Sequence, residues 1–321
     1  MKSALIDYLG PRGHVPITNF YIKNLENHFD SIYINSIIKN HIINKKKINF
    51  INFEKNFIFR FWSLLKLFLF LKNNKINKIV MLSYEPIDLF FLRIFLNLNY
   101  FKIFIFEHDT LNQKKILRFS LIKYLSRKIV HVVFTTQSKK LLKKKFNRKA
   151  MIVNLPIIKV KSNKEKIFKK KIILIPTRHH FSKRLIQNFI NQNSEFYFYI
   201  LSKKSNIQKK LFGNSNKIKL IEFIKNEDIK KMTAIYLPLD YNVYRYRISA
   251  WLYNGIAYNK KIILEQNNLY EYEKKRFPNY IILNKQVNFL KYNFKIKNKL
   301  NISKYNHKLI KTFKKSFFNV S

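Results

Sequence analysis

Residues 4–14 have the sequence Ala4-Leu5-Ile6-Asp7-Tyr8-Leu9-Gly10-Pro11-Arg12-Gly13-His14 and give the clearest indication of the fold. An apolar run leads into a turn with two glycines, and a helical pattern follows from Ile17. Only four glycines occur in 321 residues, so a pair in one turn indicates backbone that cannot accommodate side chains. This order predicts the first strand, turn and helix of an α/β domain, where ligands commonly meet the backbone. A tight turn without a ligand is the alternative.

Short apolar runs and longer helical patterns alternate along the whole chain. Several runs are almost continuously apolar, which is typical of parallel strands covered by helices on both faces. A lysine-rich stretch at residues 157–170 interrupts the alternation, which restarts at Lys171. We therefore expect two Rossmann-like, doubly wound parallel-sheet domains facing a cleft, at residues 1–156 and 171–302, with 157–170 as the linker. A terminal helix at residues 303–321 can pack back on the first domain.

The composition excludes several classes of protein. A hydrophobic content of 47% argues against disorder, and the absence of Cys excludes disulfides, thiolate zinc sites and a thiol nucleophile. The 64 Lys and Arg residues against 17 Asp and Glu give a net charge of +47, which favours anionic partners. Because the lysines are spread along the chain, we discount the charge as evidence for a specific nucleic acid. An anionic membrane surface is the partner that we expect.

No export signal is visible after Lys2, since a strand pattern with an acidic residue follows directly. The most apolar window, residues 57–71, is shorter than the roughly 20 residues of a membrane-spanning helix and contains Arg60 and Lys66. We expect a buried or interfacial helix there. The expected location is cytoplasmic, peripherally associated with the inner face of the cytoplasmic membrane.

Two clusters in the first domain place ionisable groups where a strand ends and a helix begins. Arg12 and His14 lie in the glycine turn, where His14 can take a proton from a hydroxyl or position a phosphate. Glu107-His108-Asp109-Thr110 directly follows the predicted strand at residues 101–106. It predicts a histidine that is oriented by a carboxylate and acts as a base or binds an acceptor. Helix capping by these side chains is the alternative.

A third cluster, Thr177-Arg178-His179-His180-Phe181-Ser182-Lys183-Arg184, opens the second domain. Arg178 and Lys183, together with backbone N–H groups and the positive end of a helix capped by Ser182, suit a diphosphate. A solvated basic loop is the alternative in a chain this basic.

A fourth cluster, at residues 237–249, leads into a predicted helix at 246–258. It would bring Arg245, Arg247 and Ser249 to the helix start as another anion site, while Gly255 on the buried side predicts a close approach of helix and sheet. Ordinary packing is the alternative for the tyrosines of this segment. The sequence contains no P-loop, Ser-His-Asp elbow, zinc-ligand spacing or dinucleotide fingerprint, so we expect no metal and no bound cofactor.

At these positions the chain resembles the GT-B glycosyltransferases that build bacterial surface polysaccharides, over nearly its whole length. Residues 7–14 resemble the Gly/His turn of such enzymes, with Gly10 and Gly13, and Glu107-His108-Asp109 resembles the acidic loop on their acceptor side. Arg178 and Lys183 are similar to the residues that hold the donor diphosphate. The segment that resembles the donor-site helix and its following strand includes Tyr244, Arg245, Arg247, Ser249 and Asn254.

The resemblance implies transfer of a sugar from a nucleotide-sugar, bound by the C-terminal domain, to a glycan or lipid-linked glycan acceptor presented by the N-terminal domain. The residues that would hold the donor phosphates are Arg178, Lys183, Arg247 and Ser249. Those that would take the acceptor proton in an inverting reaction are His14, Glu107, His108 and Asp109.

The chain also departs from that family. Many retaining members carry two glutamates eight residues apart, and the aligned positions here are Tyr246 and Asn254. Arg184 replaces the glycine beside the diphosphate-binding lysine. Retaining and inverting chemistry both stay open, and a catalytically degenerate GT-B scaffold subunit is an alternative. A basic nucleic-acid-binding protein, with aromatic residues interleaved in a basic face, is a further one.

Overall fold

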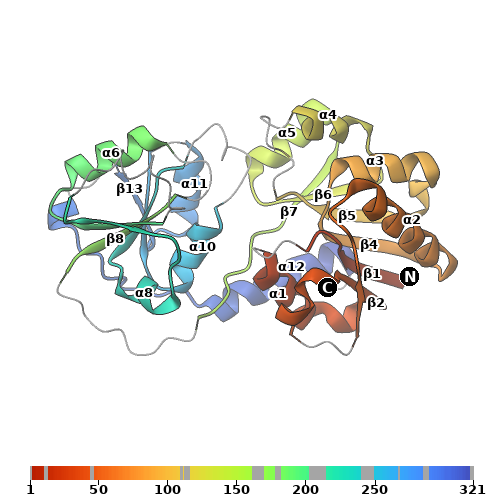
Figure 1. Ribbon diagram of the computed structural model, residues 1–321, viewed down its shortest axis with the longest axis horizontal. Coiled ribbons are helices and arrows are strands. Elements are labelled where there is room, and N and C mark those ends of the chain that lie inside the picture. The colour runs from red at the N-terminus through yellow and green to blue at the C-terminus, as the bar shows by residue number, and fades with distance from the viewer. Residues whose placement is uncertain are drawn as a thin grey trace. The chain divides into compact units, whose positions relative to one another are not determined.

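The computed structural model divides the chain into two compact units (Figure 1). The N-terminal domain comprises Met1–Pro156 and His307–Ser321, and the C-terminal domain comprises Ile157–Asn306. The structure describes residues 2–10, 14–43, 47–108, 111, 116–160, 170–177, 182–201, 215–239, 249–266, 268–284 and 289–318.

The N-terminal domain is built on a seven-stranded parallel sheet with the order β3-β2-β1-β4-β5-β6-β7. Its strands are β1 (Lys2–Asp7), β2 (Ser31–Asn35), β3 (Ile48–Ile51), β4 (Ile76–Ser83), β5 (Lys102–Phe106), β6 (Val130–Val133) and β7 (Lys149–Ile152). The inner strands are buried along almost their whole length, which explains their continuous apolar sequences. The chain order reverses between β1 and β4, and this is the switch point where ligands of such sheets bind.

Helices cover both faces of this sheet. The helical segments are α1 (Val15–Leu25), η2 (Glu26–His28), η3 (Ser36–His41), α2 (Phe57–Asn73), α3 (Pro86–Phe95), η4 (Leu98–Tyr100), α4 (Ile116–Leu121), η5 (Ile122–Tyr124), α5 (Thr136–Phe146) and α12 (Ile302–Phe318). Helices α2 and α3 pack on one face, where Phe68 joins a core with Ile79 of β4. Helices α1 and α12 pack on the other, where the rings of Phe104 and Phe317 lie 4.8 Å apart.

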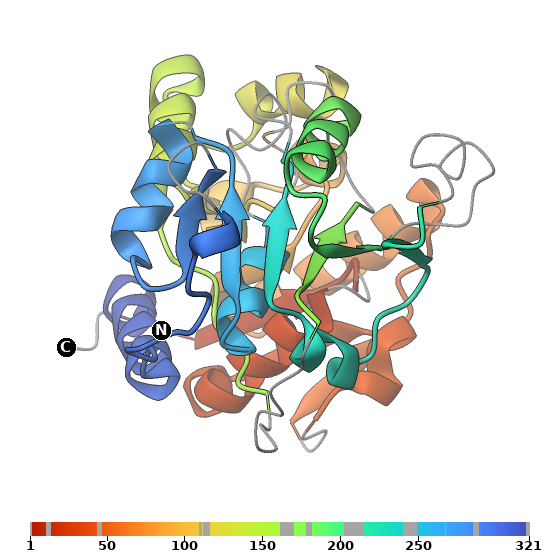
Figure 2. The ribbon, with the colours of Figure 1, turned by 90° about the vertical axis from the view of Figure 1, so that its left-hand side faces the viewer.

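The C-terminal domain has a six-stranded parallel sheet with the order β10-β9-β8-β11-β12-β13 (Figure 2). The strands are β8 (Ile172–Pro176), β9 (Tyr197–Leu201), β10 (Ile218–Ile221), β11 (Ala234–Leu237), β12 (Lys261–Leu264) and β13 (Ile281–Leu283). The helical segments are α6 (Lys183–Gln192), α8 (Asn226–Lys231), α10 (Ala250–Ala257), α11 (Asn268–Arg276) and η7 (Phe289–Lys291). Here the chain order reverses between β8 and β11.

Side chains of β11 point alternately to two helix layers. Tyr236 packs with Phe189 of α6, at a ring distance of 3.8 Å, whereas Ile235 lies on the face that meets Gly255 of α10. Both sheets are therefore doubly wound, and the predicted fold class of two parallel-sheet α/β domains is confirmed.

Helix α12 begins in the C-terminal domain and ends in the N-terminal domain. In its first part, Tyr305 accepts a hydrogen bond from Arg276 Nη2 (2.7 Å). In its last part, Phe313 and Phe317 are fully buried, and Phe313 lies 5.5 Å from the ring of Tyr21. Among the helices that the structure describes, none has the length and apolar character needed to cross a membrane.

Candidate functional site

The switch point of the N-terminal sheet holds the glycine turn. Gly10 adopts φ +51°, and a Cβ atom there would lie 2.9 Å from Asn35 Cβ and 3.1 Å from Ile37 Cγ2. The expectation that this turn excludes a side chain is confirmed for Gly10. Gly13 and Arg12 lie outside the described residues.

Two histidines predicted from separate clusters meet at this edge. His14 lies at the start of α1, after β1, and His108 follows β5. Their ring centroids are 4.1 Å apart. His108 Nε2 lies 3.0 Å from the carbonyl oxygen of Leu82, which can only accept a hydrogen bond. Nε2 therefore carries the proton, and in the neutral ring the basic lone pair belongs to Nδ1.

Glu107 lies in the core rather than beside this pair. Its side chain is fully buried, and its Oε1 accepts hydrogen bonds from Tyr84 Oη (2.6 Å) and from Nδ1–H of the fully buried His131 (2.5 Å). A carboxylate used in this way is a poor base for an acceptor and a good anchor for the end of β5. The predicted catalytic role of Glu107 thus finds no support in its position. Asp109, the next predicted residue, lies outside the described residues.

Two further buried carboxylates organise the same edge and were not predicted as site residues. Asp7 accepts from Thr18 Oγ1 (2.6 Å) and Ser83 Oγ (2.5 Å), which ties the end of β1 to α1 and β4. Asp88 pairs with Arg60 through two hydrogen bonds of 2.9 and 3.0 Å.

The Asp88 carboxylate also accepts from Tyr8 Oη (2.7 Å). Burial raises the pKa of Asp88, and the hydrogen bonds and charge of Arg60 oppose that rise. Burial likewise raises the pKa of Tyr8, and the charge of Asp88 adds to this effect. These groups fix the loop after β1 against α3, so their role is to hold the site in place.

The switch point of the C-terminal sheet holds the third predicted cluster. Ser182 caps α6, since its side chain accepts from Leu185 N (3.3 Å), as its residue type predicted. Its own N–H donates to the carbonyl of Pro238 (3.1 Å), which joins the loops after β8 and β11. Lys183 is exposed at the first position of α6, where the helix dipole favours an anion. Arg178 lies outside the described residues.

The fourth predicted cluster is described only in part. Ser249 precedes α10, is 8% exposed and makes no side-chain capping bond. Asn254 is exposed on α10. A Cβ atom on Gly255 would lie 2.8 Å from Ile262 Cγ1, so the predicted close approach of helix and sheet is confirmed. The remaining residues of this cluster lie outside the described residues: Tyr244, Arg245, Tyr246 and Arg247.

Glu265 is a polar residue at this edge that the sequence analysis missed. It directly follows β12, and its Oε1 accepts hydrogen bonds from Tyr236 Oη and from Asn284 Nδ2 (3.1 Å). Burial, followed by the charge of Glu265, raises the pKa of Tyr236. A single acidic residue after a strand forms no recognisable sequence motif. Its position next to the switch point of the sheet is the signal that could have identified it.

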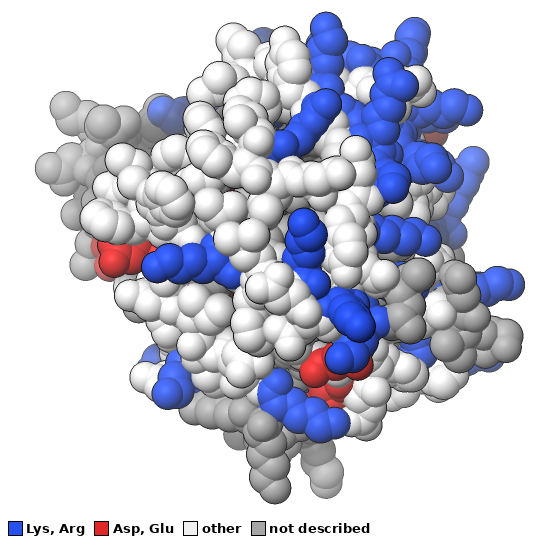
Figure 3. Space-filling model, turned by 90° about the vertical axis from the view of Figure 1, so that its right-hand side faces the viewer, with Lys and Arg blue, Asp and Glu red and all other residues white. Residues whose placement is uncertain are grey.

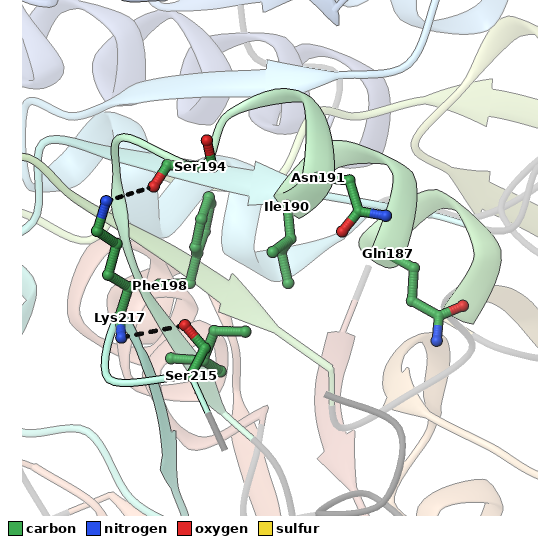
Figure 4. Close-up of a pocket in the computed structure, with 8 residues that line it drawn as sticks. Gln187, Ile190, Asn191, Ser194, Phe198, Ser215 and Lys217 are labelled. Atoms are coloured by element: carbon green, nitrogen blue, oxygen red, sulfur yellow. Dashed lines mark hydrogen bonds between the residues drawn. The ribbon is translucent and has the colours of Figure 1, made fainter. Parts of the chain in front are cut away.

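A cavity of about 470 Å³ in the C-terminal domain lies away from these residues. It opens between the second half of α6 and the start of β10, with Asn191 and Phe198 in its walls (Figure 4). Lys217 Nζ donates to the carbonyl of Ser194 (2.8 Å), so this cation is already engaged. In the part of the chain that the structure describes, no three His, Asp or Glu side chains converge to form a metal site.

No protein-family model matches the chain. No characterised protein matches it in sequence. Solved structures do match. A UDP-GlcNAc 2-epimerase from Methanocaldococcus jannaschii is 15% identical, with a TM-score of 0.57, covering 98% of this chain and 99% of that one. The Anabaena HepE protein in complex with UDP is 8% identical, with a TM-score of 0.58, covering 98% and 91%.

A glycosyltransferase from Rickettsia africae is 14% identical, with a TM-score of 0.53, covering 97% of this chain and 88% of that one. The fold is GT-B. At these identities the likeness establishes the architecture of each domain, and the chemistry has to be argued from the side chains.

Proposed function

We propose that this protein is a glycosyltransferase that moves a sugar from a nucleotide-sugar to a glycan acceptor, in the synthesis of a bacterial surface polysaccharide. The observation that carries the proposal is the contact of His14 with His108 at the switch point of the N-terminal sheet. Two imidazoles at the edge where α/β sheets bind ligands support a general base there. The GT-B neighbours include a glycosyltransferase and a UDP-bound protein, which supports a nucleotide-sugar as donor.

In this proposal the acceptor is a hydroxyl group of a glycan or of a lipid-linked glycan. Its oxygen forms a bond to C1 of the donor sugar as His14 or His108 takes its proton. The bond from C1 to the phosphate oxygen breaks, and its electron pair leaves with the nucleoside diphosphate. Lys183 and the start of α6 stabilise that charge, with Arg178, Arg247 and Ser249 as the further predicted contacts. No metal ion or bound cofactor takes part in the proposed reaction.

A second candidate is a nucleotide-sugar epimerase, because the Methanocaldococcus enzyme is covered almost completely by this chain. One assay separates the two functions. The protein is incubated with a panel of nucleotide-sugars, with and without a lipid-linked glycan acceptor, and the products are identified by mass spectrometry and NMR. A glycosyltransferase releases nucleoside diphosphate and extends the acceptor only when acceptor is present. An epimerase changes the donor sugar without acceptor, and a scaffold subunit does neither.

We also propose peripheral contact of the N-terminal domain with an anionic membrane. Helix α2 buries one side in the core and exposes Phe59, Trp62 and Phe70 on the other, alongside the exposed Lys66. On the face of the molecule shown in Figure 3, Lys and Arg side chains outnumber Asp and Glu. Trp62→Ser should weaken sedimentation with vesicles that contain phosphatidylglycerol, whereas sedimentation equal to that of the wild type would refute this contact.

A further inference from the structure

A second polar cavity, of about 560 Å³, lies at the amino edge of the N-terminal sheet. The connections that lead into β5, β6 and β7 form its walls, so it is at the opposite edge from the histidine pair. Among the described residues, four cations and three neutral polar side chains line it: Arg93, Lys123, Arg127, Arg148, Asn97, Asn99 and Ser126. None of the described residues that line it is acidic.

Arg148 is the unusual member of this set. It is 7% exposed, and its Nη2 donates to the carbonyl of Lys123 (2.6 Å). Its Nε and Nη1 are buried and have no hydrogen-bond partner among the residues that the structure describes. Burying unsatisfied donors of a charged group costs free energy that a folded protein rarely leaves uncompensated. A buried guanidinium beside a cavity therefore indicates an anion that completes its hydrogen bonds.

The neighbouring charges also indicate a bound anion. Arg93 and Arg127 are exposed at the cavity, and Arg93 Nη1 donates to the carbonyl of Tyr124. Among the described residues, no Asp or Glu forms an ion pair with any of the three arginines. Burial, and then the positive charges of Arg93 and Arg127, lower the pKa of Arg148. Three like charges gathered without a carboxylate favour a bound anion.

We propose that this cavity is a binding site for a phosphate group, with Arg93, Arg127 and Arg148 as its anchors. Guanidinium groups match the geometry of phosphate oxygens, and a dianion balances much of this charge. The volume exceeds that of free phosphate, and Leu96 and Leu125 supply an apolar wall for the group that carries it.

The phosphate can belong to a soluble phosphomonoester or to a lipid headgroup. Exposed apolar side chains of Ile94, Phe95 and Tyr124 adjoin the cavity residues in the sequence and fit the second source.

Thermal unfolding of the whole protein with inorganic phosphate tests the site. Phosphate should raise the Tm of the wild type, and the double variant Arg93→Gln, Arg127→Gln should lose most of that shift, with an apparent Kd about tenfold or more weaker. Both residues are exposed, so the fold should survive. Lys140→Gln, an exposed single charge loss on α5, controls for general loss of charge. The site would be refuted if phosphate left the Tm of the wild type unchanged. It would also be refuted if phosphate raised the Tm of the double variant as much as that of Lys140→Gln.

Vesicle sedimentation then identifies the source. Phosphatidylcholine vesicles with phosphatidic acid are compared with vesicles of equal charge that contain phosphatidylglycerol. A preference for phosphatidic acid that the double variant loses and Lys140→Gln keeps assigns the site to a lipid headgroup. Equal binding to both vesicles, with the phosphate shift intact, assigns it to a soluble phosphomonoester.

Discussion

Buried charged side chains have hydrogen-bond partners to different extents at the two edges of the N-terminal sheet. At the carboxyl edge the buried acids are paired with donors, as Asp7 is with Thr18 and Asp88 with Arg60. At the amino edge Arg148 is buried with two guanidinium nitrogens that have no hydrogen-bond partner among the described residues. Satisfied networks make a scaffold rigid, whereas buried donors without a protein partner cost free energy unless another group accepts their hydrogen bonds. The first edge is thus suited to hold side chains in fixed positions, and the second carries the anion site that we propose.

The largest expected effect concerns the histidine pair. His14→Ala and His108→Ala should each be made, and the variant that removes the base should lower the rate of sugar transfer by about 10²- to 10⁴-fold. The effect of phosphate on Tm, which reports the amino edge, should stay as in the wild type. Full transfer rates in both variants would show that neither imidazole takes the proton, and a lost phosphate effect would mean that the two edges are coupled.

The next effect is on stability at the carboxyl edge. Asp88→Ala removes the carboxylate that accepts from the largely buried guanidinium of Arg60 and from the buried hydroxyl of Tyr8, which should lower the free energy of unfolding by about 3–5 kcal/mol. Urea denaturation measures this. Asp228→Asn, which breaks an exposed ion pair with Lys231, should cost less than about 1 kcal/mol. Similar losses in the two variants would mean that the Asp88 network contributes little.

Much of the fold was predictable because it depends on local patterns. Continuous apolar runs indicated strands covered on both faces, and the order of elements implied parallel connections. The glycines were informative for the same reason, since Gly10 and Gly255 stand where a Cβ atom would collide with a neighbour. One bound differed slightly: the strand expected at residues 101–106 begins at Lys102.

The candidate site was less predictable because its partners are far apart in sequence. Tyr8 and Asp88 are 80 positions apart, and Glu107 and His131 are 24 apart, so no spacing rule could pair them. The sequence indicated Glu107 and His108 as one cluster, but strand geometry sends the first into the core. Arg148 could not be predicted because the sequence is rich in basic residues and no motif surrounds this one. Its burial in the structure is what distinguishes it.

A smaller effect extends the comparison to the C-terminal sheet. Gly255→Ala places a Cβ atom against Ile262, which should cost about 1–3 kcal/mol because α10 must move from the sheet. The free energy of unfolding should be partly restored by adding Ile262→Val, which removes the Cδ1 atom. An unchanged stability in the single variant would show that α10 and the sheet are not closely packed.

The smallest effect concerns the loop at the C-terminal switch point. Ser182→Ala removes the side-chain acceptor that caps α6 and should cost about 1 kcal/mol, as measured by urea denaturation. Ser182→Gly should cost only a few tenths of a kcal/mol, because glycine is tolerated at a helix cap. If both substitutions left stability unchanged, the start of α6 would not depend on this cap.

Besides the histidine pair, the proposed transfer requires that the C-terminal switch point binds the diphosphate of a nucleotide-sugar. Isothermal titration of the whole protein with UDP, and separately with GDP and dTDP, tests it most directly. The account predicts saturable binding of one nucleoside diphosphate per chain, weakened about tenfold in Lys183→Ala and unchanged in the control Lys140→Gln. Absence of binding for all three, or equal affinities in both variants, would contradict it.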